Sequence, residues 1–209
     1  MISPVWAVQR QAVAVPLAVL AAGAAAALAP AATTFTPKTR TVKDASGDVS
    51  GSPMDLSRVS LGRASNGELR ASLTTVKGFA VRTLRPKDGI PGSACLRLWT
   101  KTKPGAAPPD YLVCATATKD GKGLDASVLQ ERTGSTPVRV GPARASRSSS
   151  HNITLRFGQS LVGRPGAIDF AGETVPAGCA RAACTDVAPE NGKVATFRLR
   201  AGAKRPGTT

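Results

Sequence analysis

Oxygen-bearing side chains recur at alternate positions in an Asp-Ala-Ser-Gly-Asp segment early in the chain. Asp44, Ser46 and Asp48 match the first, third and fifth positions of a calcium-binding loop, and Asp55 matches the twelfth. Val49, however, stands where such a loop needs glycine, and Asp and Gly are also typical of an ordinary turn. The turn is therefore the favoured interpretation. No cofactor is expected, and calcium at these four residues is the alternative.

The chain has one histidine, His151, which lies between a run of serines and an asparagine. A hydrolase needs a serine, a histidine and an acid brought together, but the chain contains no Gly-x-Ser-x-Gly segment. A histidine in an exposed turn is the favoured interpretation. The 13 acidic residues form no local pattern that would identify a glycosidase pair. We therefore expect a protein that is not an enzyme and has no catalytic residues.

A register argument places two cysteines on neighbouring strands. The Lys-Asp-Gly-Lys segment is typical of a tight hairpin, whose register sets Val113 opposite Val128 on an apolar face. Cys114 must then point to the other face of the sheet. If Cys114 bonds Cys95, Leu96 falls opposite Val113 and the same apolar face continues.

Four cysteines allow three pairings, and an even number in an exported chain favours disulfides. The register supports Cys95–Cys114, which leaves Cys179 and Cys184 to pair locally. A four-cysteine zinc site is the competing interpretation. It is disfavoured because the Cys-x₂-Cys spacing of zinc knuckles is absent.

The same register places Trp99 on the outer face beside Arg97 and Leu112. An aromatic ring next to a guanidinium group can stack on a sugar ring or another flat ligand. These three residues are the candidate ligand-binding set. The alternative, which we favour, is that Trp99 covers the disulfide and is itself covered by the loop 103–109.

Short runs of alternating apolar and polar residues, separated by Gly, Pro, Asn and Asp, predict strands rather than helices. The expected strands lie at 56–63, 69–75, 94–100, 111–118, 124–131, 138–144, 152–157, 167–175 and 194–200. Single helical turns are expected at 79–84 and 159–162. The predicted fold class is all-β, a single antiparallel β-sandwich such as a jelly roll, with short helical turns.

The first predicted hairpin also has a definite register. Its apolar positions share one face only if Val59 lies opposite Leu73 and Leu61 opposite Ala71. That register requires a three-residue loop in which Gly67 adopts the left-handed conformation.

Residues 1–31 have the three parts of a secretory signal peptide: a positively charged start, an apolar stretch over 12–29, and small residues before the cleavage point. A retained membrane anchor is the alternative, because the apolar stretch is nearly long enough to span a bilayer. After it we expect an extended lead-in (32–41), the β-sandwich domain (42–200) and a basic flexible tail (201–209). No second spanning run follows, so a secreted, extracellular protein without a transmembrane segment is expected.

The net charge of +15 favours anionic surfaces or polymers as partners. One predicted hairpin gathers several arginines, namely Arg139, Arg144, Arg147 and Arg156. Sequence-specific nucleic-acid binding is not expected, because the basic runs lack interleaved aromatic residues. A solvated cationic surface explains the same charge and is favoured over a dedicated site.

Two stretches carry a family resemblance. DASGDVSGSPMDL (44–56) and the following hairpin RVSLGRASNGELRASL resemble the opening of extracellular β-sandwich modules, including the DOMON superfamily and family-nine carbohydrate-binding modules. FGQSLVGRPGAIDFAGET (157–174) is similar to a strand, short helix and strand near the end of those modules. The chain is more similar still to uncharacterised secreted actinobacterial proteins with the same cysteine layout.

The resemblance implies a DOMON-like sandwich, but no binding site transfers with it. Sugar-binding members clamp their ligand between aromatic rings, and only Trp99 is available here. Haem-binding members use methionine and histidine, represented here by Met54 and His151 alone.

The sequence therefore predicts a secreted, non-catalytic binding module for cell-wall or environmental glycans, or for anionic cell-surface polymers. An extracellular protein-interaction or structural domain is the alternative, and a glycan-active enzyme comes third.

Overall fold

The computed structural model describes residues 39–49, 52–64, 66–179 and 184–199. The predicted signal peptide (1–31), most of the lead-in and the tail (201–209) lie outside these residues. The described strands are β1 (Thr39–Lys43), β2 (Leu56–Arg63), β3 (Leu69–Thr75), β4 (Ser93–Trp99), β5 (Tyr111–Ala117), β6 (Leu124–Arg132), β7 (Ser135–Ser149), β8 (Asn152–Phe157), β9 (Ala167–Val175), β10 (Asp186–Ala188) and β11 (Ala195–Arg198).

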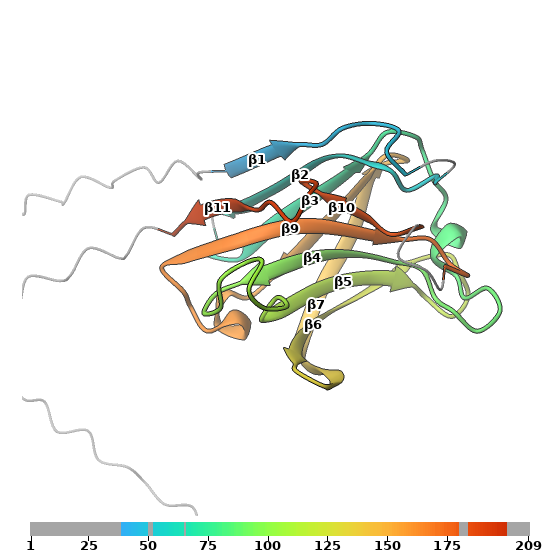
Figure 1. The fold of residues 1–209 in the computed structure, drawn as a ribbon. Helices are drawn as coiled ribbons and strands as arrows, with labels where there is room; N and C mark the ends of the chain where they lie inside the picture. Colours follow the sequence, from blue (N-terminus) through green and yellow to red (C-terminus); the bar gives the residue numbers. More distant parts are fainter. Residues whose placement is uncertain (1–38, 50–51, 65, 180–183, 200–209) are drawn as a thin grey trace, which may run out of the picture. The chain divides into compact units, whose positions relative to one another are not determined.

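These strands form one antiparallel sheet in the order β1-β2-β3-β8-β7-β6-β5-β4-β9-β10, with β11 also paired to β9. The sheet curls until it is nearly closed: β2 contacts β9 and β10, and β1 lies beside β11 (Figure 1). The long strand β7 joins the two halves, because its first part pairs with β6 and its last part with β8. The prediction of an antiparallel all-β fold is confirmed.

The predicted registers are confirmed. Val59 pairs with Leu73 across β2 and β3, and the loop after β2 places Gly67 at a φ of +82°. Across β5 and β6, Val113 pairs with Val128. These registers follow from the requirement that the apolar positions of both strands reach the same face.

The core lies between the two halves of the curled sheet. In β2, β3, β4, β5, β8 and β9, alternate apolar residues point inward and are buried. The largest fully buried side chains are Phe157, Phe170, Met54, Leu56, Leu61, Leu69, Leu73, Leu84, Leu96, Leu98, Ile153 and Leu155. They come from both halves, so the core joins them into one folded unit.

Three strands differ from the sequence-based expectation. Residues 39–41, the end of the expected lead-in, join Val42 and Lys43 in β1, which pairs with β2. β10 was not expected, and it is only three residues long. β7 spans Ser135–Ser149 instead of 138–144. Most of its side chains are exposed or half-buried, so its ends carry no apolar alternation that would mark them.

The structure forms 3₁₀ turns at Val81–Leu84 and Gln159–Val162, close to the two predicted positions. Over the described part of the chain, no helix has the length and apolar character needed to cross a membrane.

Candidate functional site

Trp99 ends β4 on the outer face, and its side chain is only 6% exposed. Its Nε1 donates a hydrogen bond to the carbonyl oxygen of Ala107 at 3.1 Å, within the loop predicted to cover it. The guanidinium carbon of Arg97 lies 5.3 Å from the centre of the ring. The ring is thus covered, as in the favoured alternative. The candidate set Trp99, Arg97 and Leu112 offers no open aromatic platform to a sugar.

Asp110 holds the loop over Trp99. Its Oδ2 accepts backbone N–H groups from Thr100 at 2.6 Å, Lys101 at 2.7 Å and Thr102 at 3.2 Å. Burial of this carboxylate acts to raise its pKa, but the N–H donors outweigh burial and the pKa of Asp110 is lowered. The carboxylate therefore stays ionised and fixes the loop.

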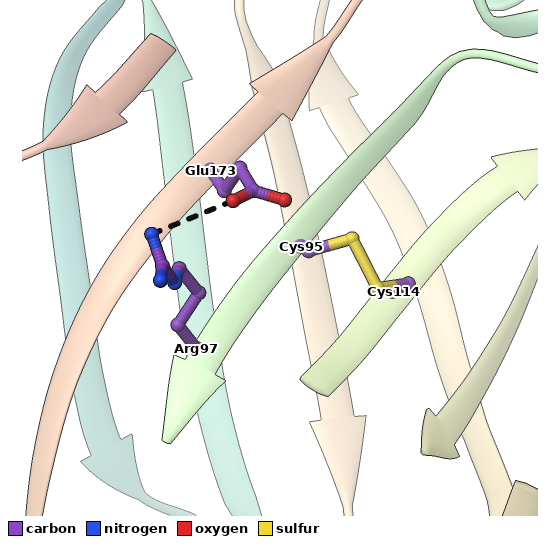
Figure 2. The surroundings of a disulfide bond; sticks show 4 residues. All are labelled: Cys95, Arg97, Cys114 and Glu173. Atoms are coloured by element: carbon purple, nitrogen blue, oxygen red, sulfur yellow. Dashed lines mark ion pairs between the residues drawn. A yellow bond between two sulfur atoms is a disulfide. The ribbon is translucent and has the colours of Figure 1, made fainter. Parts of the chain in front are cut away.

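An ion pair lies beside the first disulfide. Figure 2 shows Arg97 of β4 and Glu173 of β9 facing each other next to the bonded Cys95 and Cys114. Nη1 of Arg97 lies 3.5 Å from Oε2 of Glu173. Burial raises the pKa of Glu173; Arg97 acts in the opposite direction, and the charge of Glu131 adds to the rise. The ionised form of Glu173 is therefore unfavourable in the folded state relative to water.

We expect Glu173→Gln to raise the melting temperature around pH 8 and to leave it nearly unchanged around pH 4. A carboxyl group whose pKa is raised by folding costs stability when ionised; that cost declines as the pH falls below the folded-state pKa and is gone below the pKa of the unfolded chain. Thermal melts across this pH range measure the difference.

The control for this substitution is Asp125→Asn, which removes an exposed carboxylate from β6 and should change stability by at most about 0.5 kcal/mol. A lower melting temperature of Glu173→Gln in alkaline buffer would mean that the ion pair with Arg97 outweighs the burial of the charge.

The structure gathers an acidic cluster from two distant segments. One carboxylate oxygen each from Asp44, Asp48 and Asp186 lie within 4.8 Å of one another. Of the sequence candidates, Asp44 and Asp48 belong to this cluster. Ser46 is exposed and lines a neighbouring hollow, while Asp55 is buried beside Asp186. Asp186 was missed, because nothing in the local sequence around β10 relates it to the Asp44 loop.

The ionised forms of two carboxyl groups in the acidic cluster are unfavourable. Burial raises the pKa of Asp44 to about 7, and the charges of Asp186, Asp48 and Glu190 add to the rise. Burial likewise raises the pKa of Asp186 to about 6, where a hydrogen bond from the backbone of Leu56 acts in the opposite direction. Desolvation and repulsion between like charges thus both raise the pKa values of Asp44 and Asp186.

A cationic hollow of about 470 Å³ lies on the outer face of β1, β2, β3 and β8. Its floor is formed by small residues such as Ser60, Gly62 and Ser72, and its walls include Arg63, Arg70 and Arg156; Thr39, Ala64 and Asn66 complete the lining. We call this feature the arginine hollow. Small side chains between long cationic ones leave space above the sheet.

Arginines also lie opposite one another on the neighbouring strands β3, β8 and β7. Arg156 of β8 pairs in register with Arg70 of β3 on one side and with Arg144 of β7 on the other. Arg144 is satisfied by Glu68, with its Nη2 lying 2.6 and 2.7 Å from the two carboxylate oxygens. Arg156 also lies near enough to Glu68 to help lower the pKa of that carboxyl group, but within the described ranges neither Arg70 nor Arg156 has a carboxylate within salt-bridge distance.

His151 occupies the turn between β7 and β8 and is exposed. Its Nδ1 lies 3.1 Å from the hydroxyl of Ser150. This places it in the exposed turn that the sequence favoured.

Comparison with models of known protein families, with curated proteins and with solved structures found no match.

Proposed function

We propose that this chain is a secreted, non-catalytic β-sandwich module that binds an anionic glycan in the arginine hollow. Export through the signal peptide at 1–31 is part of the proposal. Two cysteine pairs at disulfide distance support an oxidising compartment. The net charge of +15 supports attraction to a polyanion.

The pairing of Arg70 with Arg156 carries the proposal. Like charges directly opposite on neighbouring strands destabilise a sheet, so this pair costs stability unless an anion lies between its members. Both side chains are exposed and both line the arginine hollow. A carboxylate or sulfate group placed there would accept charge-assisted hydrogen bonds from both guanidinium groups.

The floor of the hollow suits a sugar chain. Ser60 and Ser72 pair across β2 and β3 and line the hollow. The Ser72 hydroxyl accepts a hydrogen bond from Nδ2 of Asn152, and its O–H, like that of Ser60, can donate to a sugar oxygen. The small size of these side chains and of Gly62 leaves room for a ring to approach the sheet. The arginines therefore recognise the anionic groups of the ligand and the serines its hydroxyls, without aromatic stacking.

We expect Arg70→Glu/Arg156→Glu to weaken binding to an anionic glycan such as polygalacturonate or heparin at least about tenfold near physiological salt. The matched control is Arg132→Glu/Arg139→Glu, which changes the net charge equally at exposed positions of β6 and β7. Affinity measured by calorimetry in a salt titration separates the two variants.

Equal losses in both double variants would mean non-specific cationic adhesion and would contradict a site in the hollow. Failure of the unsubstituted chain to bind any anionic glycan at low salt would favour the alternative of a protein partner.

A further inference from the structure

The acidic cluster joins two edges of the sheet. Asp44 and Asp48 belong to the loop that follows β1, whereas Asp186 opens β10. β10 contacts β2, so the cluster lies where the curled sheet nearly closes. Carboxylates held this close repel one another unless protons or a cation neutralise them.

Several carboxylate oxygens at this place are buried without a hydrogen-bond partner among the described residues, namely Asp44 Oδ2, Asp55 Oδ1 and Glu190 Oε1. The strongest case is Asp55, whose side chain is only 5% exposed. Its Oδ2 accepts the backbone N–H of Gly47 at 2.7 Å, so it braces the loop that carries Asp48. Its charge also contributes to the raised pKa of Asp186, so Asp55 lies close to the cluster, although it is not one of the three carboxylates within 4.8 Å of one another.

The protein's own cations do not neutralise this place. The chain has 28 lysine and arginine residues, yet the ion pairs found in the described part involve only Glu68 and Glu173. Among the described residues, this basic protein therefore leaves a cluster of one buried, one half-buried and one exposed carboxylate without a salt-bridge partner. A buried unpaired carboxylate is costly, and a bound cation would remove that cost while the carboxylates stay ionised.

The ligand type selects the metal. Calcium is a hard cation that takes carboxylate oxygens at about 2.3–2.6 Å, so two ligands on opposite sides of one ion lie about 4.6–5.2 Å apart. The separations of at most 4.8 Å between the oxygens of the cluster are compatible with this spacing. Zinc prefers nitrogen and sulfur ligands, and magnesium demands near-ideal octahedral geometry.

We propose that Asp44, Asp48 and Asp186 bind one calcium ion, with Asp55 and Glu190 as the neighbouring carboxylates that complete its surroundings. The ion ties the loop after β1 to β10 and so fastens the open side of the sheet. This site is separate from the arginine hollow, and its failure or success leaves the glycan proposal unaffected.

The test is the melting temperature of the full chain after removal of metal with a chelator, at mildly alkaline pH and constant ionic strength. Calcium at about a hundred times its dissociation constant should raise the melting temperature by about 5–10 °C. Titration calorimetry should give one ion per chain. Magnesium should give a smaller rise.

Two variants locate the site. In Asp48→Asn, which alters an exposed side chain, the calcium concentration for half the effect should rise at least about tenfold. Asp186→Asn should weaken the calcium response in the same way. Because the carboxylate of Asp186 also accepts the N–H of Leu56, the Asp186→Asn protein can fail to fold, and Asp48→Asn is then the decisive variant. Asp125→Asn, on β6, should respond as the unsubstituted chain does.

The proposal is overturned if calcium leaves the melting temperature unchanged, or if sodium chloride at matched ionic strength reproduces the rise. It is equally overturned if Asp48→Asn responds at the same calcium concentration as Asp125→Asn.

Discussion

Gly92→Ala is expected to lower the melting temperature by about 6–12 °C, which corresponds to a loss of about 3 kcal/mol. A Cβ atom at Gly92 would lie 2.6 Å from the backbone nitrogen of Ala177, 2.9 Å from the carbonyl oxygen of Val175 and 3.0 Å from the Cα of Leu84. All three are backbone atoms, so no side-chain rotation relieves the clash. The strand ends and the 3₁₀ turn packed there must shift instead.

The matched control is Gly166→Ala, because a Cβ atom at Gly166 meets nothing within 4 Å and the backbone there is not left-handed. Alanine at such a position reduces the freedom of the unfolded chain and should stabilise the protein by about 0.4–1 kcal/mol. Equal melting temperatures for the two variants would show that the segments around Gly92 separate easily.

Removal of the disulfide between β4 and β5 should have a comparable effect. The bond joins residues 19 apart in sequence, and the loop-entropy relation assigns it about 3 kcal/mol. Cys95→Ala/Cys114→Ala should therefore melt about 6–12 °C lower than the unsubstituted protein. Thermal or denaturant unfolding of the two proteins under identical non-reducing conditions provides the measurement.

The second disulfide gives an internal comparison. Cys179 and Cys184 are only 5 apart in sequence, so the same relation assigns their bond about 2 kcal/mol. Cys179→Ala/Cys184→Ala should thus be the milder double variant. The reverse order would show that contacts of the local loop, and not chain entropy, determine what each bond contributes.

Local pattern was enough to find most strands and two registers. Leu69, Ala71 and Leu73 alternate with polar residues, and a side-chain period of two leaves only one arrangement that buries both strands of the hairpin. The Cys95–Cys114 pairing followed from the same parity. What made these features predictable is that each depends on residues close together in sequence.

The pairings that close the sheet carry no such local signal. β3 pairs with β8 and β4 with β9 across long stretches of sequence, so Arg70 and Arg156 meet only once the sheet is assembled. The same is true of Asp186, which reaches Asp44 through the packing of β10 near β2. Both candidate sites therefore depend on tertiary structure that the sequence pattern does not contain.

The edges of the nearly closed sheet bear on self-association. An edge strand presents unpaired N–H and C=O groups, which can template the addition of another chain and lead to fibrils. Here β1 carries Arg40 and Lys43, and it lies beside β11. β10 and β11, on the other edge, have only three and four residues. Positive charge on one edge strand and the short length of the strands on the other edge thus oppose edge-to-edge association of this sheet with further chains.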